Sequence, residues 1–216
     1  MQSREYWRDK IDTGARELGF KDGYGLLYGP WAILDQAKIA FVSLNPGGGG
    51  EGDSERSVDY ERGNSYEDTE SQWAISSQFM RMCRDVLQVR ATDILTGVAV
   101  PYRSRNWNAL TSDQKLEGEL IGRQFWGEAL GHRRRDLVVT CSTLATSMIV
   151  RATNATLDSE IPAKWGKAML RRYVSNDGAI IVALPHLSRF KLFSREQCKS
   201  ALHDIFEIAP RQFNIK

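Results

Sequence analysis

The chain has 216 residues, of which 42% are hydrophobic, and this is enough to build one domain with a full core. Its 29 basic and 27 acidic side chains leave a formal net charge of +2, so any affinity for nucleic acid must come from a local patch. The three cysteines, Cys83, Cys141 and Cys198, form no C-x-x-C pair, which argues against a zinc ribbon, an iron–sulfur cluster or a disulfide framework.

The first twenty residues carry charges throughout and lack the apolar segment of a secretory signal. No apolar run reaches the ~18 residues that a membrane-spanning helix requires. We therefore expect a cytoplasmic protein with no membrane partner. We also expect a monomer built as one domain over residues 1–216, in which 1–30 form an N-terminal helical cover.

Hydrophobic periodicity predicts helices and strands in alternation. Trp7, Ile11 and Leu18 follow one another at roughly helical spacing, and the short apolar run 39–44 is typical of a strand buried on both faces. Ser112 and Ser194 are candidate helix N-caps. The expected strands are 39–44, 94–100, 137–141 and 179–184, and the expected helices are 4–18, 72–87, 112–130, 143–151 and 194–206.

This alternation predicts an α/β fold with three layers, α/β/α, around a central, mainly parallel, four-stranded sheet. Ligands of such sheets bind at the carboxyl ends of the strands. The segments that follow the first and fourth strands are therefore the places to look for chemistry. Residues 51–70 are polar and acidic without an apolar period, which predicts a long loop over the end of the first strand.

The first strand ends in the motif Leu-Asn-Pro-Gly, followed by three more glycines. The strand delivers the amide of Asn45 to the edge of the sheet, Pro46 restricts the turn, and Gly47 and Gly48 leave the backbone bare, so that a bulky group can approach. By itself this is also an ordinary turn or an anion-binding nest. A P-loop is not indicated, because no Gly-Lys-Ser/Thr follows.

The fourth strand ends in Pro-His-Leu-Ser-Arg-Phe-Lys. This segment places an imidazole (His186), a hydroxyl (Ser188), cations (Arg189 and Lys191) and an aromatic ring (Phe190) within a few residues. Such a segment is able to contact both a base and its phosphate.

Taken together, the two motifs resemble those of the uracil-DNA glycosylase superfamily, with a first motif like that of its mismatch-specific and thymine-type members. The resemblance covers about 39–193 in the order of elements, and only the two short motifs match closely. It implies that Asn45 positions the attacking water and that His186 stabilises charge on the departing base. It also implies that Ser188 holds a phosphate and that Phe190 is the wedge that fills the space of a flipped nucleotide.

The resemblance implies a metal-free, cofactor-free enzyme that acts on DNA. It implies cleavage of an N-glycosidic bond, which passes through an oxocarbenium-like state and needs a positioned water and a hydrogen-bond donor to the base. Neither motif contains an internal lysine for a Schiff base, which favours a monofunctional glycosylase, although Lys191 is close by.

The glycines distinguish this chain from the uracil-specific members, in which an aromatic residue follows the first-motif proline and excludes 5-substituted pyrimidines. We therefore expect Pro46, Gly47 and Gly48 to line a roomy base pocket, with Tyr66 stacking on the base and Thr96 or Tyr102 at its edge. The substrate hypothesis is a bulky 5-substituted pyrimidine, including the hypermodified cytosines of phage DNA as in an anti-phage defence enzyme, or uracil or a mismatched thymine.

Other basic residues and aromatics have competing interpretations. Arg103, Arg105, Arg189 and Lys191 are expected to form a phosphate-facing patch, whereas residues 133–135 (Arg-Arg-Arg) are expected to form a solvated turn. Phe190 and Phe193 are alternatively core residues that anchor the last helix. Packing is likewise the expectation for Trp107, Trp126 and Trp165, and a solvated position for Glu51, Asp53 and Glu55.

Two alternative functions remain open from the sequence. One is a catalytically silent module that binds modified DNA or nucleotides in the same cleft. The other is a small-molecule or nucleotide hydrolase, for which binding depends little on salt, whereas DNA binding weakens steeply as salt rises.

Overall fold

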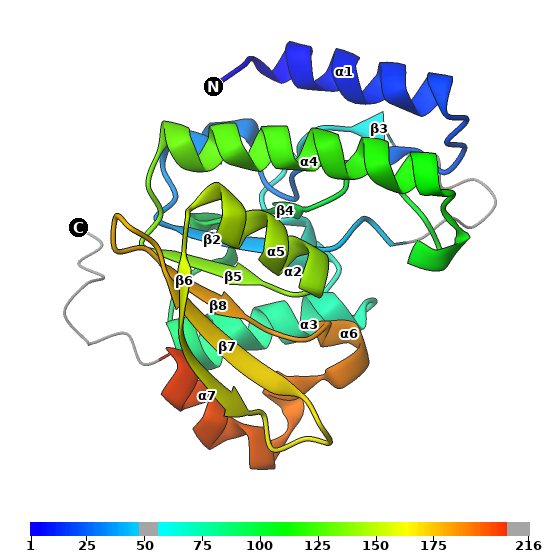
Figure 1. The fold of residues 1–216 in the computed structure, drawn as a ribbon. Coiled ribbons are helices and arrows are strands. Elements are labelled where there is room, and N and C mark those ends of the chain that lie inside the picture. Colours follow the sequence, from blue (N-terminus) through cyan, green and yellow to red (C-terminus); the bar gives the residue numbers. More distant parts are fainter. Residues whose placement is uncertain (48–55, 207–216) are drawn as a thin grey trace.

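Six strands form the main sheet, in the order β4-β2-β5-β8-β7-β6 (Figure 1). The structure is a computed structural model that describes residues 1–47 and 56–206. The strands of this sheet are β2 (Ile39–Ser43), β4 (Ile94–Val98), β5 (Leu137–Thr140), β6 (Thr156–Pro162), β7 (Met169–Val174) and β8 (Ile180–Ala183). The helices are α1 (Arg4–Glu17), α2 (Ser65–Asp68), α3 (Ala74–Arg81), α4 (Ser112–His132), α5 (Thr143–Ala152), α6 (Leu187–Phe190) and α7 (Lys199–Phe206).

The four strands expected from the sequence form the parallel part of the sheet. β2 pairs in parallel with β4 on one side and with β5 on the other, and β5 pairs in parallel with β8. Every residue of β2, β4 and β5 is buried, which is why these strands appear in the sequence as mostly apolar runs. The prediction of a mainly parallel α/β sheet is confirmed.

The prediction of four strands is wrong, because a hairpin of β6 and β7 extends the sheet beyond β8. β7 runs antiparallel to β8, and β6 runs antiparallel to β7 at the edge. β6 is mostly exposed and has a register shift between Leu157 and Ser159, and β7 contains two adjacent arginines. Edge strands of this kind are held mainly by backbone pairing with a neighbouring strand. They contain no apolar run from which the sequence would predict a strand.

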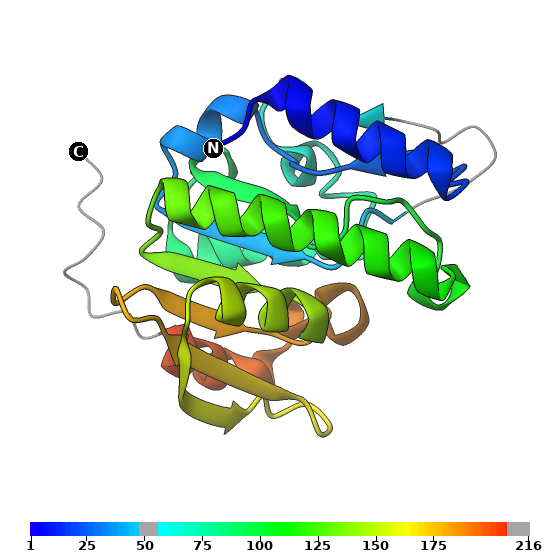
Figure 2. The same ribbon diagram turned by 45° about the horizontal axis from the view of Figure 1, so that its top comes forward.

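Helices cover both faces of the sheet, so that two hydrophobic clusters form. One cluster joins α1, α4 and α5 to the sheet and includes Trp7, Trp126 and Ile149. The other joins α3 and α7 to the opposite face and includes Phe79 and Ile205. Figures 1 and 2 show α1 lying along α4, above the sheet. Among the described residues, no helix combines the length and the hydropathy needed to cross a membrane.

Several element boundaries differ from those expected. The helix expected over 72–87 begins at Ala74 and changes after Arg81 into a π-helical segment, and the last helix begins at Lys199 instead of Ser194. The N-cap of α4 is Thr111, whose side chain forms a capping box with Gln114.

The described part of the expected loop 51–70 contains α2 and a short strand. The remaining short elements are β1 (Tyr24–Gly25), β3 (Arg56–Ser57), the π-helical Met82–Leu87, and 3-10 turns at Trp31–Asp35, Ala91–Asp93, Trp107–Ala109, Leu192–Ser194 and Glu196–Cys198.

Arg135 is buried, which corrects the expectation that all of 133–135 form a solvated turn. Its Nη1 donates to the carbonyl of Ala37 and its Nη2 to that of Leu34, at 2.7 Å for the second. Burial lowers the pKa of this guanidinium to about 10. Arg135 therefore satisfies backbone carbonyls ahead of β2, while Arg133 and Arg134 are exposed as expected.

Helix α4 approaches the chain beyond β4 closely at two glycines. A Cβ atom placed on Gly122 would lie 1.7 Å from the carbonyl oxygen of Ala99, and one on Gly118 would lie 2.5 Å from Cγ1 of Val100. The indole N–H of Trp126 donates to the carbonyl of Val98 at 2.8 Å. The helix is therefore fixed directly against the strand end that leads into the segment 101–106.

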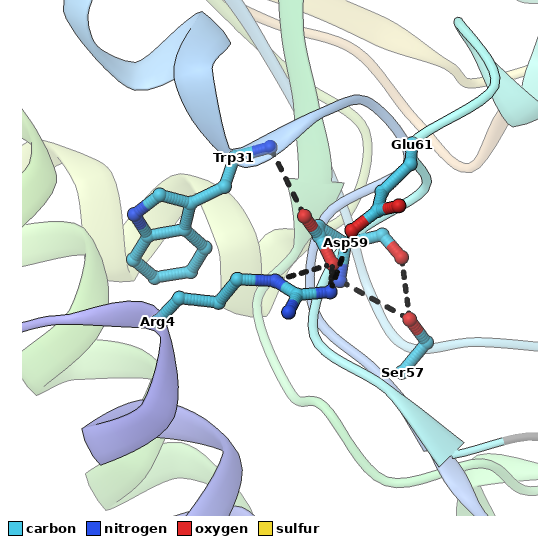
Figure 3. Close-up of polar contacts among 5 residues, drawn as sticks. All are labelled: Arg4, Trp31, Ser57, Asp59 and Glu61. Atoms are coloured by element: carbon cyan, nitrogen blue, oxygen red, sulfur yellow. Dashed lines mark hydrogen bonds and ion pairs between the residues drawn. The ribbon is translucent and has the colours of Figure 1, made fainter.

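Asp59 ties α1 to the segment that follows β3, as Figure 3 shows. Its Oδ1 accepts from Nε and Nη2 of Arg4, at 3.0 and 2.7 Å, and its Oδ2 accepts from the backbone N–H of Trp31 at 3.2 Å. The Asp59 side chain is 2% exposed, whereas that of Arg4 is 36% exposed. One carboxylate therefore joins three segments that are distant in the sequence.

Replacing Asp59 with alanine is expected to lower the free energy of unfolding by about 2 kcal/mol, because the bonds to Arg4 are charge-assisted and the Trp31 N–H loses its acceptor. Urea titration measures the change. Asp9→Ala is the matched control, because Asp9 is 71% exposed and pairs only with its neighbour Arg8 among the described residues. Equal stability of the two variants would contradict the proposed role of Asp59.

Candidate functional site

Asn45 and His186 lie at the same edge of the sheet. Asn45 follows β2 and His186 follows β8, and β5 is the strand that separates β2 from β8. All three strands are parallel, so their carboxyl ends meet at one edge. With neighbouring strands ~4.8 Å apart, the axes of β2 and β8 are about 10 Å apart. The motifs of Asn45 and His186, which are far apart in the sequence, therefore lie at the same part of the carboxyl edge of the sheet.

The Asn45 side chain is oriented by two backbone carbonyls. Its Nδ2 donates to the carbonyl of Pro46 at 3.1 Å and to that of Tyr102 at 3.4 Å. No hydrogen bond among the described residues engages Oδ1 of Asn45. Since the side chain is half-buried, this oxygen is able to accept a hydrogen bond from a water or a ligand.

His186 is held at the N-cap position of α6. Its Nδ1 lies 2.7 Å from Oγ of Ser188, two residues further on. The side chain is half-buried, and burial lowers the pKa of His186 below its ordinary value. The imidazole is therefore neutral near pH 7. Ser188, which the resemblance assigns to a phosphate, contacts His186 in this structure.

A cavity of about 1010 Å³ opens beside His186. Its lining comes from the ends of β2, β5 and β8 and from α4, α5, α6 and β7. Leu44 and His186 line it, whereas the Asn45 side chain is outside its lining. The cavity thus begins at the strand edge near the two motifs and continues away from Asn45, along α5.

The lining is basic and contains aromatic rings. Glu119 is its one carboxylate among the described residues. Its aromatic residues are Trp107, Tyr173 and Phe190, and its cationic residues are Arg123, Arg151, Lys167, Arg171 and Arg189. A cavity with this excess of positive charge favours anionic ligands. Within residues 1–47 and 56–206, His, Cys, Asp and Glu side chains form no group of three that could hold a metal ion.

The residues expected to form the base pocket are only partly brought together. Pro46 is buried and Gly47 is exposed beside Asn45, while Gly48 lies outside the described residues, as do Glu51, Asp53 and Glu55. Tyr66 is 4% exposed, with its hydroxyl 3.0 Å from Oγ of Ser43 and its ring among core aromatics.

Thr96 and Tyr102 are likewise unavailable to a ligand in this structure. Both are fully buried. Thr96 Oγ1 accepts from Asn64, and the Tyr102 hydroxyl donates to the carbonyl of Ile11. Thr96, Tyr102 and Tyr66 are therefore buried structural side chains, and we do not retain them as base contacts.

Four of the expected DNA-contacting residues lie beside His186. Arg189 is exposed, Phe190 is half-buried, and both line the cavity, with the guanidinium 5.8 Å from the ring centre. Ser188 contacts His186, and Lys191 is exposed with a φ of 49°, so it lies in the left-handed region. Phe193 is buried, as expected for a core residue that anchors the last helix.

The other two expected contacts follow β4. Arg103 is half-buried and donates from Nη1 to the carbonyl of Gly47 at 3.0 Å. Arg105 is exposed in the same segment. Arg103 thus holds the backbone of Gly47, a role that its position in the sequence does not reveal.

Sequence reasoning missed the cavity wall formed by α5 and β7. Met169, Arg171 and Tyr173 share the cavity face of β7, but the strand MLRRYV shows no apolar and polar alternation that would have revealed it. Of the three tryptophans expected to pack in the core, Trp126 is fully buried. Trp107 is half-buried at the cavity, and Trp165 is 38% exposed.

No protein-family model and no curated protein matches the chain. The geometry of the site is therefore what supports a function.

Proposed function

We propose that the protein is a monofunctional DNA glycosylase that takes a modified pyrimidine out of the base stack and hydrolyses its N-glycosidic bond, leaving an abasic site. One observation carries the proposal: an amide and a neutral imidazole, Asn45 and His186, flank the same carboxyl edge with one strand between them. Hydrolysis of an N-glycosidic bond requires a group that holds the water on one side of the sugar carbon C1′ and a group that stabilises negative charge on the base leaving from the other side.

His186 supplies the hydrogen bond to the departing base. When the Ser188 hydroxyl donates to Nδ1, the neutral imidazole carries its proton on Nε2, which is then the donor to a carbonyl oxygen of the base. The C1′–N bond breaks with both electrons moving to the base. The resulting anion is stabilised by this hydrogen bond and afterwards takes a proton from solvent.

Asn45 positions the attacking water. Its Nδ2 is occupied by two carbonyls, which leaves Oδ1 as the acceptor for a water proton. The water oxygen forms the new bond to C1′, and its proton leaves to solvent. An amide is not a base, so the water becomes reactive only as positive charge develops on the sugar, and turnover is correspondingly slow.

Space beside Asn45 supports a substituted pyrimidine as the substrate. A Cβ atom on Gly47 would meet no atom of residues 1–47 and 56–206 within 4 Å, so the backbone there leaves room where a side chain would exclude a 5-substituent. The substrates that fit this room are bulky 5-substituted pyrimidines, including hypermodified cytosines of phage DNA. Uracil and mismatched thymine are the smaller alternatives.

The decisive experiment measures abasic-site formation on DNA that carries uracil, 5-hydroxymethylcytosine or its glucosylated form, as single strands and as duplexes, and on duplexes with a mismatched thymine. We expect the enzyme to release one of the substituted bases. Activity on plain uracil alone would contradict the roomy pocket. Strand cleavage at the abasic site, trapped with borohydride, would contradict a monofunctional mechanism, because it requires a lysine Schiff base.

A catalytically silent binding module is the second candidate. The observation that favours it is the position of Asn45, an amide outside the lining of the cavity. Tight binding of modified DNA without abasic sites on any of these substrates would establish this alternative and remove the glycosylase.

The pH profile of base release tests the state of His186. Because burial lowers its pKa, the neutral donor form persists where an ordinary histidine, with a pKa of about 6.5, is half protonated. We expect the change in activity that protonation of His186 causes to have its midpoint below about pH 6.5. His186→Gln keeps an N–H donor but cannot be protonated, so its residual activity should lack this change. A midpoint above about pH 6.5 would contradict a lowered pKa.

A further inference from the structure

The hairpin of β6 and β7 creates a groove that the two motifs do not account for. α5 packs over β5 and β8, and α7 packs against the opposite face of β6 and β7. Met169, Arg171 and Tyr173 alternate along β7, so they share the face that lines the cavity beside α5. Figure 2 shows α5 running beside the hairpin on the near side of the sheet, with α7 behind it. The α5–β7 groove is defined here as this part of the cavity.

Cations line the groove from three elements. Arg123 comes from α4, Arg151 from the end of α5, and Arg171 from β7. Arg123 pairs with Glu119 at 2.9 Å, and Arg171 pairs with Glu160. Arg151 and Lys167, both exposed, make no ion pair with any described residue. Two positive charges at the groove are therefore uncompensated.

Three aromatic rings line the same cavity, each from a different part of the chain. Phe190 is next to the His186 end, Tyr173 is on β7, and Trp107 is in the segment that precedes α4. Each ring is half-buried, so it is anchored in the fold and still presents surface to the cavity. Aromatic rings and cations in one cavity are what an unpaired nucleic-acid strand requires, because bases stack on the rings and phosphates contact the cations.

We propose that the α5–β7 groove binds unpaired DNA next to the nucleotide held at His186, so that the substrate of the site is single-stranded DNA. The inference rests on the proposed function for the identity of the polymer and for the position of the target nucleotide. In a duplex, neighbouring bases cover both faces of each base, so a base cannot stack on an aromatic ring inside the groove. A single strand exposes both its base faces and its phosphates.

Fluorescence anisotropy with a labelled, unmodified oligothymidylate of about 12 nucleotides tests the proposal against a duplex of the same length. We expect the single strand to bind at least about tenfold more tightly than the duplex. Arg151→Glu and Lys167→Glu should each weaken binding of the single strand and lower its salt dependence by a log–log slope of about 0.7 per lost phosphate contact.

Matched controls come from the opposite edge of the sheet. Lys38 precedes β2 and Arg133 precedes β5, and both are exposed, so Lys38→Glu and Arg133→Glu reverse the same charges away from the groove. These variants should bind the single strand like the unmodified protein. Trp107→Leu removes a stacking ring without changing charge and should weaken binding with the salt slope unchanged. Thermal unfolding confirms that each variant is folded.

Equal or tighter binding of the duplex would overturn the proposal, as would unchanged binding in both groove variants. Binding of thymidine monophosphate as tight as that of the oligonucleotide would identify a nucleotide pocket and would also overturn it. Retained abasic-site formation without this preference refutes the groove and leaves the glycosylase. Retained preference without any abasic site refutes the glycosylase and leaves the groove as a single-strand binding site.

Discussion

Replacement of His186 by alanine is expected to slow base release by about 10²- to 10³-fold, the usual cost of removing one donor that stabilises charge in a transition state. Asn45→Ala is expected to have an effect of similar size, because the water then lacks its positioning acceptor. Single-turnover measurement of abasic sites detects both effects without interference from product release.

Two control variants keep this prediction specific. His203 is exposed on α7, and Asn176 is exposed between β7 and β8. His203→Ala and Asn176→Ala remove the same groups elsewhere and should leave the rate unchanged. Substrate affinity should change little in Asn45→Ala, since its side chain is outside the cavity lining. A His186→Ala enzyme that still releases base at the full rate would refute the proposed mechanism.

Gly122→Ala is expected to destabilise the fold by about 3 kcal/mol or more, because added atoms in a packed core force the backbone to move. The new Cβ would lie 1.7 Å from the carbonyl oxygen of Ala99 and 2.9 Å from its carbonyl carbon. These are backbone atoms, so no side-chain rotation relieves the contact. The helix has to shift away from the strand end that it covers.

Gly127→Ala makes the same chemical change five residues further along α4 and should have the opposite effect. A Cβ there meets no atom of the described residues within 4 Å, and alanine favours a helix over glycine, so a gain of about 0.5–1 kcal/mol is expected. Urea unfolding of the two variants compares them directly. A loss of stability in both would show that helix propensity misjudges this surface, and no loss in Gly122→Ala would show that α4 is not held at Ala99.

The parallel core of the fold and the ends that carry the two motifs are predictable from the sequence. The strands that contain Phe41 and Ile181 are buried on both faces, so each appears as an apolar run followed directly by its motif. Asn45 and His186 fall together because parallel strands share a carboxyl edge. Physical chemistry therefore leads from two short sequence segments to one site.

The edge hairpin is not predictable in the same way, and with it the larger part of the cavity was missed. β6 has no apolar alternation, and β7 holds Arg171 and Arg172 side by side, so neither resembles a half-buried strand. Tyr66 illustrates the opposite error. A tyrosine in a polar segment suggests exposure, yet its ring is enclosed by Phe41 and Phe79, because α2 folds back onto the sheet.

The position of the hairpin places the residues for ligand binding in the groove and the residues for the reaction in different parts of the sheet. The side chains that face the groove from β7 and its turn, Arg171 and Lys167, are exposed and lie at the periphery of the sheet, so exchanging them costs little stability. Asn45 and His186 follow strands of the parallel core. Under the proposed function, mutations at the periphery can therefore change ligand preference while Asn45 and His186 keep the reaction chemistry.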